Sequence, residues 1–91
     1  MSPFLGGSAY GMAAQIAEGY TLITAVQLKR LTLDEMGQLQ FELERLARDT
    51  RAEQLPLDDI AALQARNRRL SRITGALQAI QAARAKRRPG S

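Results

Sequence analysis

The stretch TLDEMGQLQFELERLARDT, residues 32–50, contains both the start signal and the core-facing pattern of one helix. Thr32 and Glu35 have the Thr-x-x-Glu spacing of a capping box, in which the threonine oxygen accepts an amide proton and the glutamate reaches back. Apolar side chains then recur at steps of three and four, which is typical of a buried helical face. They are Met36, Leu39, Leu43 and Leu46. We therefore predict a helix over about residues 33–53.

A second, longer helix is predicted to follow almost at once, over about residues 57–87. Leu55-Pro56-Leu57 interrupts the first helix, because proline disfavours helical geometry in the residue before it. Pro56 suits the start of the next helix, and Asp58 and Asp59 place negative charge at its positive end. The apolar stripe of this helix, into which one asparagine falls, consists of Ile60, Leu63, Asn67, Leu70, Ile73, Leu77 and Ile80. Two helices with so short a connection fold back as an antiparallel hairpin.

The segment before Thr32 is expected to cover part of the longer helix, which outreaches the shorter one by about 15 Å at 1.5 Å per residue. Apolar residues at helical spacing favour a helix over about residues 8–29, whereas residues 20–26 are rich in β-prone side chains. We favour the helix. Residues 1–7 are predicted to be a flexible arm, residues 8–88 a single helical domain and residues 89–91 a tail.

The fold expected from these segments is all-α: a long antiparallel helical hairpin with an N-terminal helical segment, completed as a helical bundle by self-association. A two-helix unit buries little core, so we expect a homo-oligomer, with a dimer as the favoured form. Asn67 bears on this expectation. An asparagine in an apolar seam can fix register by pairing with a copy of itself, or it can lie at the rim and meet water.

The composition of the chain excludes most catalytic chemistry. Its 91 residues include no cysteine and no histidine, which removes thiolate nucleophiles, sulfur-ligated metals and the usual general base. There is no phosphate-binding glycine loop, and aromatic residues, at 4%, are too few for a typical ligand pocket. We expect no enzyme activity, no catalytic residue, no cofactor and no metal. The lack of cysteine fits a reducing, cytoplasmic location, and the first basic residue, Lys29, comes too late for a secretory signal.

Basic side chains gather on the longer helix, which carries no acidic residue after Ile60, in a chain of net charge +4. They are Arg66, Arg68, Arg69, Arg72, Arg84, Lys86, Arg87 and Arg88. One interpretation is that they solvate the helix and pair with the acidic helix before it, each exposed pair contributing under ~1 kcal/mol. The other is a phosphate-binding stripe for DNA or RNA. We favour the first, because the net charge is modest and no base-stacking aromatics are interleaved with the arginines.

Phe41 lies almost opposite the apolar face of its helix, so either residues 8–29 pack over it or it marks a surface for a partner protein. The function we expect is that of a non-catalytic helical scaffold or adaptor. It would act through helix–helix contacts, both with copies of itself and with an unidentified protein partner. The alternative is a nucleic-acid-binding accessory protein that uses the basic face. A third hypothesis, association with a membrane through residues 8–28, is disfavoured by the Gly, Ser, Thr and Gln content of that segment.

Overall fold

The computed structural model of the chain describes residues 7–87 and confirms the all-α class. Within those residues it contains four α-helices and no strand. The helices are α1 (Ala9–Glu18), α2 (Ala25–Lys29), α3 (Leu33–Ala52) and α4 (Ile60–Arg87). The predicted arm over residues 1–7, apart from Gly7, and the predicted tail over residues 89–91 lie outside the described residues.

Helix α3 begins where the sequence predicts. The Thr32 hydroxyl accepts a hydrogen bond from the Glu35 amide at 3.1 Å, and the Glu35 carboxylate accepts one from the Thr32 amide at 2.8 Å. These two bonds complete the capping box and satisfy amides that have no partner inside the helix. The helix ends at Ala52, beyond which Glu53 is extended on the way to Pro56.

Helix α4 begins at Ile60, three residues later than the predicted start at residue 57. The Asp59 carboxylate accepts a hydrogen bond from the Ala62 amide at 3.0 Å, so this aspartate caps the helix from outside. The Asp59 amide in turn donates to the Pro56 carbonyl at 3.1 Å, which places Pro56 in the preceding turn. An aspartate prefers the capping position, and this preference outweighs the suitability of proline for the first helical turn.

The predicted single helix over residues 8–29 is wrong, because the segment forms two helices separated by an extended loop. Gly19 ends α1 with a φ of 84°, a left-handed conformation that glycine adopts without a steric penalty. The Gly19 amide donates to the Ile16 carbonyl and the Tyr20 amide donates to the Gln15 carbonyl, which is a Schellman motif. Helix α2 then starts with a second capping box, formed by Thr24 and Gln27.

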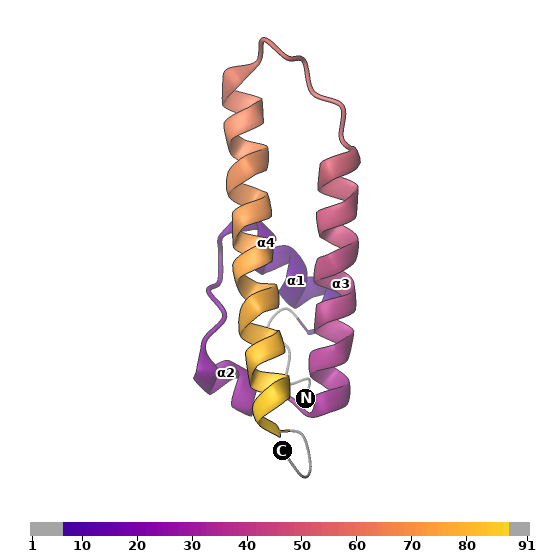
Figure 1. The fold of residues 1–91 in the computed structure, drawn as a ribbon, viewed down its shortest axis with the longest axis vertical. Coiled ribbons are helices and arrows are strands. Elements are labelled where there is room, and N and C mark those ends of the chain that lie inside the picture. Colours follow the sequence, from indigo (N-terminus) through magenta and orange to yellow (C-terminus); the bar gives the residue numbers. More distant parts are fainter. Residues whose placement is uncertain (1–6, 88–91) are drawn as a thin grey trace.

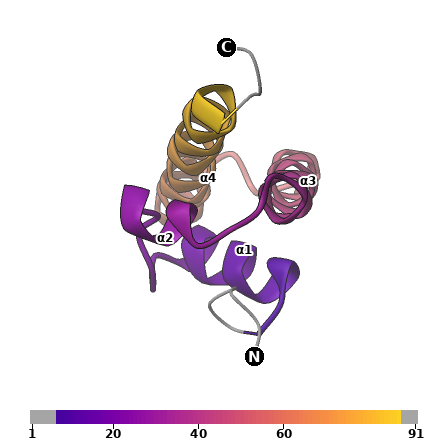
Figure 2. The same ribbon diagram turned by 90° about the horizontal axis from the view of Figure 1, so that it is seen from below.

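The helices are arranged in two layers. Helices α3 and α4 run antiparallel beside each other, joined by the connection at the top of Figure 1. Helix α1 crosses one face of this pair and contacts both helices, while α2 packs against the C-terminal half of α4. Seen from below, α1 and α2 lie on the same side of the α3–α4 layer (Figure 2). The opposite face of that layer carries no other helix of residues 7–87.

The core lies where α1, α3 and α4 meet, with Leu28 and Leu31 closing its lower end. Its largest fully enclosed side chains are Met12, Leu31, Met36, Leu39, Leu43, Ile73 and Ile80. Burial of each such side chain contributes about 1.5–3 kcal/mol relative to exposure. Leu70 and Leu77 are only half-buried and pack against the edge of this core. The buried face of α3 is therefore the predicted one, whereas α4 buries only part of its predicted stripe.

Candidate interaction surface

Helix α4 carries a mostly apolar row that the fold buries only in part. We call it the outer strip, and it consists of Ile60, Leu63, Asn67, Leu70, Thr74 and Leu77. The three leucines are half-buried, whereas Asn67 and Thr74 are exposed and Ile60 is 66% exposed. These six side chains of α4, four apolar and two polar, thus form a continuous surface beside the core.

The outer strip stays outside because α4 turns a neighbouring row toward the other helices. Ile73, Ala76 and Ile80 point into the core, where they are at most 3% exposed. At 3.6 residues per turn, Leu70 and Leu77 lie on one side of this row, and Arg72 and Ala79 lie on the side that meets α1 and α2. Ile60 and Asn67, predicted for a helix-packing or oligomer seam, therefore lie outside the core of the chain, and Asn67 meets the solvent.

The tip of the hairpin extends beyond the cover that α1 provides. The last residues of α1 meet α4 at Arg69 and Arg72, and the first two turns of α4 extend past the end of α3, where they lie beside the connection between the two helices (Figure 1). Leu57, in the connection, is 90% exposed. This lack of a third helix explains why Ile60 finds no apolar cover.

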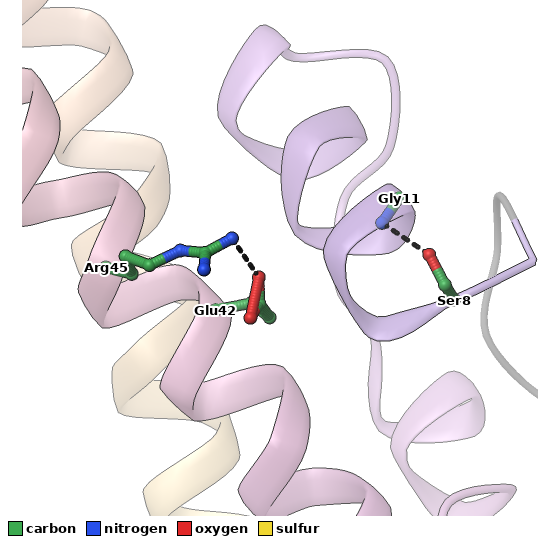
Figure 3. Close-up of polar contacts among 4 residues, drawn as sticks. All are labelled: Ser8, Gly11, Glu42 and Arg45. Atoms are coloured by element: carbon green, nitrogen blue, oxygen red, sulfur yellow. Dashed lines mark hydrogen bonds and ion pairs between the residues drawn. The ribbon is translucent and has the colours of Figure 1, made fainter.

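Phe41 lies on a second, smaller exposed surface, beside the N-terminal end of α1. It is 55% exposed, and Tyr10 nearby is 53% exposed. The Arg45 guanidinium lies over the Tyr10 ring, 5.7 Å from its centre, and also binds the Glu42 carboxylate at 2.9 Å (Figure 3). The Ser8 hydroxyl caps α1 by accepting a hydrogen bond from the Gly11 amide at 2.9 Å, also drawn in Figure 3. Helix α1 therefore borders Phe41 without covering it.

Two of the predicted anion-binding arginines bind the end of α1 instead. Arg72 donates from Nη1 to the Ala17 carbonyl at 3.0 Å, and that carbonyl is one of those left without an intrahelical partner at the end of α1. Arg69 forms an ion pair with Glu18 and donates from Nε to the buried Thr50 hydroxyl at 3.1 Å. A cation at a helix C-terminus also stabilises the helix dipole, by about 0.3–1 kcal/mol.

Three further arginines of α4 bind the ends or flank of α2 and α3. Arg66 donates to the Glu53 carbonyl at 3.3 Å, just past the end of α3, and Arg84 donates to the Gln40 side chain at 2.7 Å. Arg87 donates to the carbonyls of Leu28, Lys29 and Leu31, at 2.7 Å for Lys29. The arginines thus join α4 to each of the other three helices.

The remaining predicted anion contacts are few. Arg68 and Lys86 are exposed and form none of these bonds within residues 7–87, and Arg88 lies outside the described residues. In the same range, no group of acidic side chains is placed to hold a metal ion. No helix there is both long and apolar enough to cross a membrane.

Comparison with known proteins gives no relative from which a function can be transferred. No protein-family model, no curated protein sequence and no solved structure matches this chain.

Proposed function

We propose that this chain is a non-catalytic helical scaffold or adaptor that acts through helix–helix contacts, and that its first such contact is with a second copy of itself. The observation that carries the proposal is the outer strip of α4. It presents leucine and isoleucine side chains along about five turns of α4, while a different row of the same helix is buried in the core. A row of partly exposed apolar side chains along one face of a helix is a candidate interaction site on a small protein.

Two further features support a protein partner over nucleic acid. Arg66, Arg69 and Arg72 already donate to groups of the same chain, so phosphate binding would compete with bonds that hold the helices together. The outer strip itself contains no charged residue, and phosphate recognition depends on charge. We propose a cytoplasmic setting, in keeping with the absence of cysteine.

Sedimentation of the purified chain across the micromolar range tests this proposal. We expect the wild-type protein to shift from monomer to dimer as its concentration rises. The double variant Ile60→Lys/Thr74→Lys should remain monomeric at every concentration, because it places like charges in the contact without touching the core. Ala61→Lys/Ala82→Lys is the matched control, because it adds the same charge at exposed positions of α4 outside the strip, and it should dimerise like the wild type.

Sedimentation with added nucleic acid distinguishes this proposal from the alternative of a nucleic-acid-binding protein. A wild-type protein that stays monomeric alone but co-sediments with duplex DNA or RNA, with an affinity that falls steeply as salt rises, would contradict the proposal. In that case the variant Arg68→Gln/Lys86→Gln, which changes exposed basic residues that form none of the bonds between helices, should weaken nucleic-acid binding. If the scaffold proposal holds, that variant should leave the dimer intact.

A further inference from the structure

We infer that the second copy docks on the outer strip in a parallel coiled coil of two α4 helices, with Asn67 of one copy facing Asn67 of the other. This inference rests on the proposed function, because it specifies the partner and the geometry of the self-contact. Four properties of α4 support it: the spacing of the strip, its boundaries, its charge and the place of its asparagine.

The outer strip has the seven-residue repeat of a coiled coil. Leu63, Leu70 and Leu77 are seven residues apart, and so are Ile60, Asn67 and Thr74, each three residues before a leucine. In heptad notation the leucines occupy the d positions and the other three the a positions. Leucine at d with β-branched residues at a favours two-stranded parallel coiled coils, and two of these three a residues are β-branched.

The fold leaves this repeat ready to pair. On one side it is bounded by Ile73 and Ile80, which are fully buried in the core of the same chain. Leu70 and Leu77 pack against that core and still expose part of their surface. Because α1 and α2 lie on the other side of the buried row, a second copy can approach the strip without displacing them.

The charge distribution permits contact between identical copies. Each chain carries a formal net charge of +4, so two copies repel each other over most of their surfaces. Along the free flank of the strip the side chains are uncharged, namely Gln64, Ser71 and Gln78. The nearest arginine on the other flank, Arg66, is bonded to the Glu53 carbonyl. Among the exposed surfaces of α4, the strip is therefore where two copies meet with the least repulsion.

Asn67 selects the parallel orientation. In a parallel coiled coil the a residues of both helices share a layer, so the amide of one Asn67 donates to the carbonyl of the other. In an antiparallel pair, Asn67 would instead face a leucine of the d row. An amide buried without a partner would lower affinity by roughly 5- to 150-fold. The same penalty disfavours parallel pairs shifted by one heptad.

The size of the strip predicts a reversible dimer. From Ile60 to Leu77 the helix rises about 26 Å, and with a helix width of about 10 Å the contact covers on the order of 260 Å² in projection on each copy. Stable complexes bury about 800 Å² of accessible surface per partner, which a strip of this size does not reach. We therefore expect a dissociation constant in the micromolar range or weaker.

Single-cysteine variants test the geometry cleanly, because the chain contains no cysteine. Ile60→Cys and Thr74→Cys change exposed a positions, and circular dichroism should show both variants folded. A parallel dimer brings each cysteine within disulfide distance of its own copy, so both variants should form disulfide-linked dimers on mild oxidation. Ala61→Cys, one position away and outside the strip, is the control and should form far less.

A mixture of the Leu63→Cys and Thr74→Cys proteins distinguishes the orientations directly. The two positions are about 16.5 Å apart along a helix, so a parallel dimer forms no disulfide between the two variants, whereas an antiparallel dimer that places Asn67 opposite Leu70 also places Leu63 opposite Thr74 and can form one. Mixed disulfides, or a wild-type dimer in which neither variant links to itself, would overturn the inference and leave the proposed function standing. A wild-type chain that is monomeric in sedimentation would overturn both.

Asn67→Ile provides an independent test of the asparagine layer. Replacing the polar pair by an apolar one should tighten association by about tenfold or more and relax its specificity, so that antiparallel or larger assemblies appear. In the mixing experiment this background should now yield mixed disulfides. Unchanged affinity and unchanged cross-linking would show that Asn67 does not lie in the contact.

Discussion

Truncation of two neighbouring residues of α4, Ile73→Ala and Leu70→Ala, should separate folding from association. Ile73 is fully buried among α1, α3 and α4, whereas Leu70 is half-buried at the edge of the core and lies in the outer strip. Each substitution removes three carbon atoms from a side chain of the same helix. Ile73→Ala should therefore lower the free energy of unfolding more than Leu70→Ala does, whereas only Leu70→Ala should weaken association.

The magnitudes follow from burial. Three buried carbon atoms at about 0.8 kcal/mol each give about 2.4 kcal/mol for Ile73→Ala, and the cavity left behind raises the loss into the range of about 2–5 kcal/mol. At Leu70 at most about a third of that surface is exposed in the monomer, so the remaining two thirds give a loss of about 1.6 kcal/mol, without a closed cavity to add to it. In the dimer each copy loses the apolar contact of that exposed third, about 0.8 kcal/mol, and a combined loss of about 1.6 kcal/mol weakens association about 15-fold.

Urea unfolding followed by far-ultraviolet circular dichroism measures the first effect. The protein concentration must lie well below the dimer dissociation constant, because association would add to the apparent stability. The slope of the free energy against urea should stay the same in both variants. Sedimentation of the folded proteins measures the second effect, in which Ile73→Ala should associate like the wild type. Equal destabilisation by the two variants, with association unchanged by Leu70→Ala, would show that the leucine row belongs to the core.

Two further predictions concern the contacts that fix α1 and α2. Arg87→Gln should raise amide hydrogen exchange in α2 while leaving the centre of α3 protected, because Arg87 donates to three carbonyls at the end of α2, and Lys86→Gln should change nothing. Gly19→Ala should lower the free energy of unfolding by about 1 kcal/mol or more, since the residue has a φ of 84° and an added Cβ would lie 3.0 Å from Arg72 Nε. Gly75→Ala should instead stabilise the helical chain by about 0.5–1 kcal/mol, because nothing lies within 4 Å of its added Cβ. Thermal and urea unfolding compare the two glycine variants, and equal effects would contradict the left-handed conformation of Gly19.

The sequence predicts the elements that local signals define. Helix α3 follows from the Thr32–Glu35 capping box and an unbroken apolar face, and both features are observed. Signals of the same kind, at the start and end of a helix, also mark the division of the N-terminal segment into α1 and α2. Thr24-x-x-Gln27 is also a capping box, and Gly19 is a suitable residue to end the helix before it. The apolar residues keep a helical spacing across the loop between α1 and α2, and that spacing favoured the prediction of a single helix.

The orientation of α4 could not be predicted in the same way. Apolar residues cover a wide arc of this helix, and the rows Leu63–Leu70–Leu77 and Ile73–Ile80 are each consistent with a buried face. Which row turns inward depends on where α1 crosses, and that position is set by contacts distant in sequence, such as Arg72 with the Ala17 carbonyl. Sequence periodicity predicts that a helix has an apolar face, but it does not show which part of that face the core buries.

Several arginines of α4 lie along the row of this helix that faces the core. Steps of four and three from Ile73 toward the N-terminus lead to Arg69 and Arg66, and steps of three and four from Ile80 lead to Ala83 and Arg87. The core row therefore has guanidinium groups at both of its ends. There Arg66 and Arg87 donate to carbonyls at the ends of α3 and α2, which lack donors within their own helices, and Arg69 pairs with the Glu18 carboxylate at the end of α1. The neighbouring outer strip carries no charged residue, and an uncharged heptad repeat is suited to another helix and not to phosphate.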